Sequence, residues 1–373
     1  METTTQMDVR ELLARIDAGE PVRVLDVRND DDFLRWRLEG ARPVETLHVP
    51  YFEFVEDEDA AVGRLPGGAG ELAVLCAQGG SSDYVAGVLR ARGLPARNVA
   101  GGMVAYGEAL FPVRVPLHPE DEGRLEIWQV NRRGKGCLSY VIRSGDEAMV
   151  VDPARHAEWY ASFADGLGAR VARVMDTHVH ADHLSGGAAL AARYRLPYSP
   201  AVGAGGELGR ELEIRALATP GHTPGSISLL VGGRYLLSGD TLFVSGVGRP
   251  DLGGDVEGWA RALHRTLREQ IAPLPDGVLV LPAHWSSAAE ARPDGVVAAT
   301  LGELRRTAPE LQLASEDDFA ALMHKGARPA PAAYAEMVRV NLGLATCRPA
   351  QAAEWELGRN ECAAGQKRKQ EVQ

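Results

Sequence analysis

Cysteine is scarce in this sequence: only four occur among 373 residues, at positions 76, 137, 347 and 362. Four cysteines spread over such a length do not make a disulfide framework, so we expect free thiols and a reducing compartment. No stretch approaches the roughly 18 apolar residues of a membrane span. The start Met1-Glu2-Thr3 also lacks a basic region followed by an apolar one. We therefore expect a cytoplasmic protein without a membrane partner.

Positive charge is also in deficit, because 40 Lys and Arg face 51 Asp and Glu and give a net charge of -11. Nucleic-acid binding relies largely on clusters of Lys and Arg, so the balance argues against a nucleic-acid partner. The 45% hydrophobic content of so long a chain is sufficient for two domains, each with its own core.

The chain divides at residues 112–124, where three prolines and an acidic run replace hydrophobic periodicity. We interpret this segment as a linker. Helix and strand patterns alternate before it, which favours an α/β fold. After it, strand patterns dominate up to His284 and helical patterns follow, and we expect a disordered polar tail at 364–373. The predicted strands include Val22–Leu25, Leu72–Leu75, Leu125–Val130, Leu138–Arg143 and Ala148–Val151; the predicted helices are Asp8–Ala18, Tyr84–Arg92, His156–Asp165, Leu184–Arg195, Thr300–Arg306, Glu316–His324 and Ala332–Val340.

Seven potential metal ligands follow strand-like runs, and four of them lie within the heptapeptide Thr177–His183. Histidine nitrogen and carboxylate oxygen suit zinc or non-haem iron. No cysteine lies within the pattern to indicate a closed structural zinc site. The sequence thus predicts a metal site made by His178, His180, Asp182, His183, His222, Asp240 and His284.

The order of these ligands, together with Asp152 in Met149–Pro153, resembles the metallo-β-lactamase superfamily. The resemblance implies a four-layer αβ/βα sandwich over residues 125–363, with the metal between the two sheets. It leaves two ligand arrangements open. A glyoxalase II likeness implies two zinc ions: His178, His180 and His222 bind the first, Asp182, His183 and His284 the second, and Asp240 bridges them. A bridging hydroxide would then hydrolyse a thioester.

In the other arrangement, His178, His222 and Asp240 hold one Fe(II), with open positions for dioxygen and a substrate sulfur. The remaining residues then surround and orient these ligands, with Asp182 also a candidate catalytic group. This secondary set comprises Asp152, His180, Asp182, His183 and His284.

The segment Gly248-Arg249-Pro250-Asp251-Leu252 resembles persulfide dioxygenases more than glyoxalase II, as does the ending Arg359–Cys362. This resemblance implies that Arg249 helps to hold a thiol-bearing substrate. The tyrosine that commonly follows the last motif histidine in that family is missing, because Trp285 follows His284. Cys137, at the start of a strand pattern, is expected to pack in the core.

The first half contains a loop, Cys76–Ser82, between a predicted strand and a predicted helix. Its glycines let backbone N–H groups point inward, and the helix N-terminus adds partial positive charge, which both favour a thiolate. Inert packing is the alternative for a lone cysteine. With Val24–Arg28 and Val99–Tyr106, the loop resembles a rhodanese domain, here residues 1–111. The resemblance implies that Cys76 carries sulfane sulfur and that Gly79 and Ser81 bind substrate, with Ser81 where many members have arginine.

These inferences favour a persulfide dioxygenase that oxidises a low-molecular-weight thiol persulfide, such as glutathione persulfide, with O2 to sulfite and free thiol. We expect one Fe(II) per chain, with two Zn as the alternative in a glyoxalase II-like thioester hydrolase with a degenerate rhodanese domain. A sulfur-carrier or docking protein without metal turnover is a third possibility. The thiol carrier and assembly into a homo-oligomer are left open.

Overall fold

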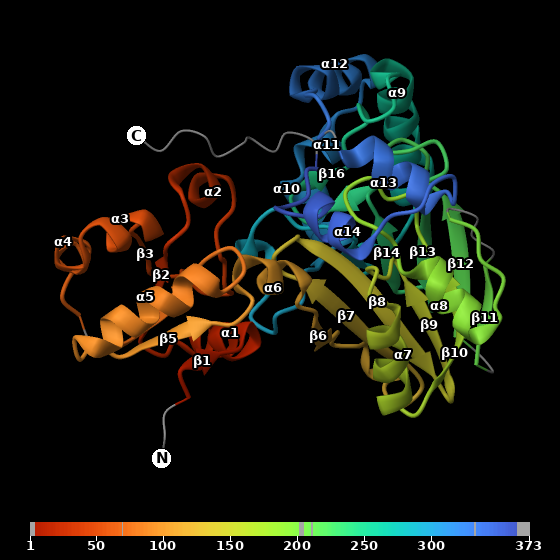
Figure 1. The fold of residues 1–373 in the computed structure, drawn as a ribbon. Coiled ribbons are helices and arrows are strands. Elements are labelled where there is room, and N and C mark those ends of the chain that lie inside the picture. Colours follow the sequence, from red (N-terminus) through yellow and green to blue (C-terminus); the bar gives the residue numbers. More distant parts are fainter. Residues whose placement is uncertain (1–3, 69, 201–204, 210–211, 332, 364–373) are drawn as a thin grey trace.

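The structure is a computed structural model that describes residues 4–68, 70–200, 205–209, 212–331 and 333–363 (Figure 1). The tail 364–373, for which the sequence predicts disorder, lies outside the described residues, as does Ala332 at the start of a predicted helix.

The N-terminal part forms a parallel five-stranded sheet in the order β1-β5-β4-β2-β3 (Figure 1). Helices α1 and α6 pack on one face of this sheet, and α3 to α5 pack on the other. The central strands are covered on both faces, so they appear in the sequence as short apolar runs without alternation. The strands are β1 Gln6–Met7, β2 Val22–Asp26, β3 Thr46–His48, β4 Glu71–Leu75 and β5 Ala96–Val99; the helices are α1 Val9–Ala18, α2 Asp30–Arg35, α3 Tyr51–Glu56, α4 Glu58–Gly63, α5 Gly80–Ala91 and α6 Gly102–Glu108.

The rest of the described chain is built on two facing sheets. One has the order β10-β9-β8-β7-β6 and the other β11-β12-β13-β14-β17-β18. Side chains such as Ile142 and Met149 from the first sheet form one core with Leu229 and Leu281 from the second. The strands are β6 Phe111–Arg114, β7 Glu126–Arg132, β8 Cys137–Ser144, β9 Glu147–Val151, β10 Arg170–Met175, β11 Gly206–Leu208, β12 Leu212–Ala218, β13 Ile227–Val231, β14 Tyr235–Gly239, β17 Leu279–Pro282 and β18 Ala299–Thr300, and a separate hairpin joins β15 Leu242–Phe243 to β16 Gly246–Val247.

Helices cover the outer faces of both sheets. Tyr160 of α7 and Leu190 of α8 pack on the first sheet, and Leu263 of α9, Leu304 of α10 and Phe319 of α12 pack on the second. The layer order is helix, sheet, sheet, helix, and the predicted αβ/βα sandwich is confirmed. The helices are α7 Ala157–Gly166, α8 Gly187–Tyr194, α9 Val256–Thr266, α10 Leu301–Thr307, α11 Pro309–Gln312, α12 Glu316–Gly326, α13 Ala333–Asn341 and α14 Pro349–Trp355, with 3-10 turns at Pro119–Asp121 and Ala288–Glu290 and a π-helical turn at Leu267–Ile271.

The expected linker, residues 112–124, is a structured connection. Its first residues belong to β6, which pairs antiparallel with β7 as an edge strand of the first sheet. An edge strand tolerates Pro112, because a proline at the edge costs no ladder hydrogen bond. Further along, Asp121 accepts a hydrogen bond from the Tyr235 hydroxyl at 2.9 Å. The exact domain boundaries remain a prediction.

Candidate metal centre and sulfur loop

The potential metal ligands come from loops that follow strands of both sheets. Asp152 follows β9, and the segment 177–183 follows β10, its parallel neighbour. Asp240 and His284 follow β14 and β17, which are also parallel neighbours. Because neighbouring parallel strands end at the same sheet edge, the two loops of each pair lie side by side. The two pairs meet where His178 Nε2 lies 3.6 Å from Asp240 Oδ2.

His178, His222 and Asp240 converge on one point. Asp240 Oδ2 lies 3.6 Å from His178 Nε2 and 3.3 Å from His222 Nε2, and all three residues are at most 1% exposed. Within the described residues, His178 Nε2 and Asp240 Oδ2 have no hydrogen-bond partner. Donors that share one ion at about 2.1 Å lie roughly 3.0 to 3.4 Å apart, so these atoms fit a metal site with three protein ligands.

Hydrogen bonds fix which nitrogen of each histidine faces this point. The Thr177 hydroxyl donates to Asp152 Oδ2 at 2.9 Å, so at 3.0 Å it accepts from His178 Nδ1. His222 Nδ1 donates to the Arg249 carbonyl at 2.9 Å. Both Nε2 atoms therefore keep a free lone pair toward Asp240. Asp152 has a positive φ of 52°, a conformation that costs energy for a non-glycine residue.

The His180 ring packs against the His178 ring, with centroids 4.3 Å apart, but its Nε2 is turned away from the three converging donors. Its Nε2 is 3.2 Å from Asp152 Oδ1, and it forms a separate buried group with Asp152 and Asp176. The arrangement with His178, His180 and His222 on one ion remains a prediction, and it requires His180 to exchange its contact with Asp152 for one with the ion. Burial raises the pKa of Asp176, which accepts a hydrogen bond from Tyr198 at 2.5 Å.

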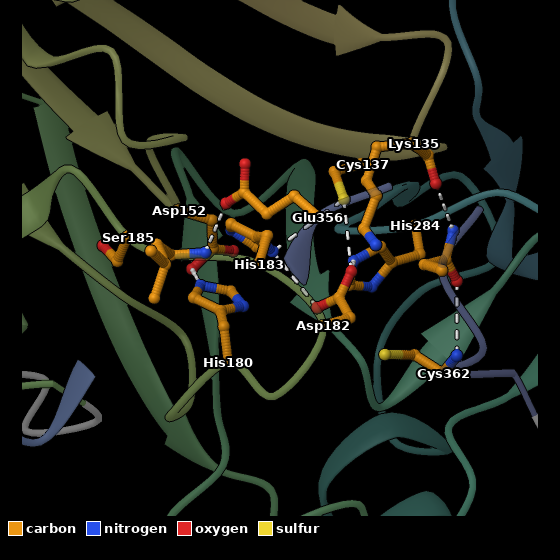
Figure 2. Close-up of polar contacts among 12 residues, drawn as sticks. Lys135, Cys137, Asp152, His180, Asp182, His183, Ser185, His284, Glu356 and Cys362 are labelled. Carbon is orange, nitrogen blue, oxygen red and sulfur yellow. Dashed lines mark hydrogen bonds and ion pairs between the residues drawn. The ribbon is translucent and has the colours of Figure 1, made fainter. Parts of the chain in front are cut away.

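The other expected ligands, Asp182, His183 and His284, contact one another (Figure 2). His284 bridges two carboxylates, with Nδ1 at 2.6 Å from Asp240 Oδ1 and Nε2 at 3.0 Å from Asp182 Oδ2. Burial opposes charge on His284, but these two carboxylates hold its pKa well above the usual value. His183 Nδ1 lies 3.1 Å from Asp182 Oδ1. Burial lowers the pKa of His183, but the charge of Asp182 outweighs it and raises the pKa to about 10.

Two cysteines line the same place, which the sequence pattern did not indicate. Cys137 Sγ lies 3.2 Å from Asp182 Oδ2. Cys362 Sγ lies within 4.8 Å of ligand atoms of Asp240 and His284. Figure 2 shows the two thiols on either side of Asp182 and His284. Cys137 is buried, as expected, and its thiol also contacts the candidate ligand Asp182. The β-bridge between Cys137 and His284 explains the proximity, but it joins residues far apart in the sequence.

Arg249 is buried and its guanidinium is already paired. It donates to both oxygens of Asp251, at 2.5 and 2.6 Å, and also to the backbone carbonyl of Arg328. Its contact with the metal site is made by the backbone carbonyl that accepts from His222. A direct role of the guanidinium in substrate binding remains a prediction that requires this ion pair to open.

Cys76 lies at the end of β4, before the N-terminus of α5, and is 6% exposed. Its Sγ accepts a hydrogen bond from the Gly79 N–H at 3.0 Å and lies 3.1 Å from Ser82 Oγ. Gly79 has φ of 97°, which suits glycine and turns its N–H toward the sulfur. The Ser81 hydroxyl makes no side-chain hydrogen bond within the described part of the chain, whereas the Ser82 hydroxyl contacts the sulfur. Substrate binding by Gly79 and Ser81 remains a prediction.

Two family models match this chain. The rhodanese-like domain model matches residues 8–109, and the metallo-beta-lactamase superfamily model matches residues 132–202 and 195–284. The chain is thus a fusion of a rhodanese-like domain with a second domain of a metal-binding fold. It belongs to the metallo-beta-lactamase superfamily.

Relatives with two activities match at similar identity. Persulfide dioxygenase ETHE1 of Bos taurus is 32% identical over 53% of this chain and 80% of its own length. Hydroxyacylglutathione hydrolase of Polaromonas is 37% identical over 37% of this chain, and the match spans 57% of that protein. The crystal structure of ETHE1 from Myxococcus xanthus, 27% identical, covers 58% of this chain and 98% of its own, with a TM-score of 0.52.

Among the described residues, none of the helices has the length and apolar character that a membrane span requires.

Proposed function

We propose that this protein is an iron-dependent persulfide dioxygenase with a sulfur-carrying rhodanese domain. The observation that carries the proposal is the convergence of His178, His222 and Asp240 on one point, while His180 Nε2 is turned to Asp152. Two histidines and one carboxylate with open positions are the ligand set of non-haem iron oxygenases. Iron held by these residues would supply the activation of dioxygen.

The proposed reaction is RSSH + O2 + H2O → RSH + H2SO3. The sulfane sulfur gives up four electrons, dioxygen accepts four, and the S–S bond breaks to release the thiol. The protein orients the ligands: Asp152 and Thr177 hold His178, the Arg249 carbonyl holds His222, and His284 holds Asp240. We assign the reaction to the cytoplasm, with a small thiol persulfide and O2 as substrates.

Cys76 would carry sulfane sulfur between a donor and a small thiol. Its thiolate attacks the outer sulfur of a persulfide RSSH, an S–S bond forms at Cys76, the donor S–S bond breaks, and RS⁻ leaves and takes the proton. The step is redox-neutral and needs no further reagent. The Gly79 N–H and the helix N-terminus at the loop support an anionic sulfur there.

A zinc-dependent thioester hydrolase is the second candidate. Two observations favour it: the hydroxyacylglutathione hydrolase relatives, and the four-residue group of Cys137, Asp182, His183 and His284, whose ligand atoms lie within 4.8 Å of one another. In this candidate, that group would hold a second ion and Asp240 would bridge the two.

The deciding experiment is metal analysis by mass spectrometry on protein purified without added metal, combined with dioxygen consumption on glutathione persulfide. We expect about one iron per chain and rapid consumption that yields sulfite. About two zincs per chain, no dioxygen consumption and hydrolysis of a glutathione thioester would overturn the proposal in favour of the hydrolase.

A further inference from the structure

A chain of four polar side chains runs from the protein surface to the sulfur of Cys76. Gln6 Nε2 donates to Asp83 Oδ1 at 2.8 Å, and Asn98 Nδ2 donates to Gln6 Oε1 at 2.8 Å. Ser82 Oγ then lies 2.7 Å from Asn98 Oδ1 and 3.1 Å from Cys76 Sγ. Gln6 and Asp83 are exposed, whereas Ser82 and Asn98 are at most 4% exposed.

The carboxylate of Asp83, at the exposed end of this series, sets which group donates in each of its hydrogen bonds. An ionised carboxylate can only accept, so Asp83 requires the NH2 group of Gln6 to face it. The Gln6 carbonyl must then face Asn98, which turns the Asn98 NH2 group to Gln6 and the Asn98 carbonyl to Ser82. Ser82 therefore meets an acceptor on one side and the Cys76 sulfur on the other.

Ser82 has a single hydroxyl proton for these two acceptors. When Cys76 is a neutral thiol, the amide oxygen is the better acceptor, and Ser82 Oγ can accept from the S–H. When the sulfur is an anion, a hydrogen bond to it is charge-assisted and is roughly twice as strong as a neutral one. The two states of the sulfur thus favour opposite orientations of one hydroxyl.

We propose that Ser82 is a positioning residue for Cys76: its hydroxyl turns from Asn98 to the sulfur when the sulfur becomes anionic, and Asn98 opposes the turn. Ser82 then promotes the thiolate and the persulfide anion, whereas Asn98 restrains them. This inference rests on the proposed role of Cys76 as a sulfur carrier. It is separate from the substrate-binding role predicted for Ser81, which remains a prediction.

The test is the rate at which iodoacetamide alkylates Cys76 at pH 7 in the full-length protein, followed by mass spectrometry of the peptide that contains it. Ser82→Ala removes the donor to the anion, and we expect a rate about tenfold lower. Asn98→Leu frees the Ser82 proton for the sulfur, and we expect a rate about threefold higher. Ser82→Thr keeps the hydroxyl and should restore most of the rate.

Ser81→Ala removes a neighbouring hydroxyl of the same helix turn that does not contact the sulfur, so it should slow alkylation less than Ser82→Ala does. Gln6→Ala removes the hydrogen bonds that link Asp83 to Asn98, and Gln6 is exposed, so this variant tests the proposal even where Asn98→Leu impairs folding. We expect a small increase in the alkylation rate. The proposal predicts a lower alkylation rate in Ser82→Ala and a higher one in Asn98→Leu. A loss of packing alone would not produce changes of opposite sign. A lower rate in both Asn98→Leu and Gln6→Ala, or a larger effect of Ser81→Ala than of Ser82→Ala, overturns the proposal.

The alkylation test does not depend on turnover. If wild-type protein gains no sulfur at Cys76 from glutathione persulfide, measured by intact mass, the proposed carrier role fails, while the alkylation rates still decide the role of Ser82.

Discussion

At the scale of single residues, the metal centre depends on groups that never touch the metal position. The Thr177 hydroxyl lies between Asp152 and His178 and contacts both side chains. Thr177 donates two hydrogen bonds to the Asp152 carboxylate, at 2.6 and 2.9 Å, which help to hold the strained φ of Asp152. Such partners fix the tautomer and orientation of a ligand histidine.

Thr177→Val removes the hydroxyl at nearly constant size and leaves His178 Nδ1 without its acceptor. We expect iron affinity to fall about 10- to 100-fold, because that is the usual effect of losing such a partner. Iron retention against a chelator measures it. Thr177→Ser keeps the hydroxyl and should retain iron like the wild type; equal loss in both variants would contradict the role of the hydroxyl.

A second pair of variants separates the one-ion and two-ion arrangements. His178→Asn removes one of three converging donors and should abolish tight iron binding. His180→Asn removes a residue that contacts Asp152 instead, so the chain should still bind about one iron. Metal content of the two purified variants is the measurement. Equal loss of metal in both would place His180 on the ion.

The sequence indicated that His178, His222 and Asp240 could lie together, because each follows a strand and their order resembles a known family, but it left open which of the seven residues share an ion. It was not sufficient for Cys137, Cys362 and Ser82. Cys137 and Cys362 reach the site through contacts between distant segments, and Ser82 differs from Ser81 only in the direction its side chain takes on the first turn of α5. None of these leaves a periodic signal.

At the scale of elements, residues at the end of α14 connect three parts of the fold. Glu356 is 3% exposed, accepts from Arg132 of β7 at 2.8 Å and from Arg155 at 2.9 Å, and also accepts from the Leu184 N–H at 2.7 Å. Leu184 directly follows the ligand segment 177–183. The C-terminal helices therefore help to fix the loop that carries the candidate ligands.

This ion pair predicts how stability depends on pH. Burial raises the pKa of Glu356, but the charges of Arg132 and Arg155 outweigh it and lower the pKa to about 2 from 4.5. A lowered folded-state pKa means that the stabilisation is complete above pH 4.5 and is lost as the pH falls toward 2. Glu356→Gln should cost about 3 kcal/mol at pH 7, and this difference from wild type should shrink below pH 4.5.

Urea unfolding of both proteins from pH 7 to pH 3 measures the effect. Glu354→Gln, an exposed neighbour on the same helix, should change stability little at any of these pH values. A difference between Glu356→Gln and wild type that stays constant over this range would show that the charge of Glu356 is not its cause.

At the scale of the whole molecule, the rhodanese-like half and the two-sheet half meet at the turn between β7 and β8. Trp36 Nε1 donates to the Gly134 carbonyl at 2.9 Å, and Arg133 pairs with Asp17 at 2.5 Å. Arg132 also donates to the Gly107 carbonyl at 2.6 Å. Figure 1 shows α6 of the first half beside β6 and β7 of the second. Arg132 also pairs with Glu356, which accepts a hydrogen bond from Leu184 just after the ligand segment 177–183. The contact between the halves is therefore connected to the residues that hold this segment.

Gly134 makes that close approach feasible, since a Cβ there would lie 2.6 Å from the Tyr106 carbonyl oxygen and 2.8 Å from the Gly107 Cα. Both are backbone atoms, so Gly134→Ala must push the halves apart. We expect the alanine variant to unfold at a lower temperature and in two transitions by calorimetry, while wild type unfolds in one. Gly277→Ala adds the same methyl group where nothing lies within 4 Å, and it should keep a single transition. One unshifted transition in Gly134→Ala would mean that the contact does not couple the unfolding of the two halves.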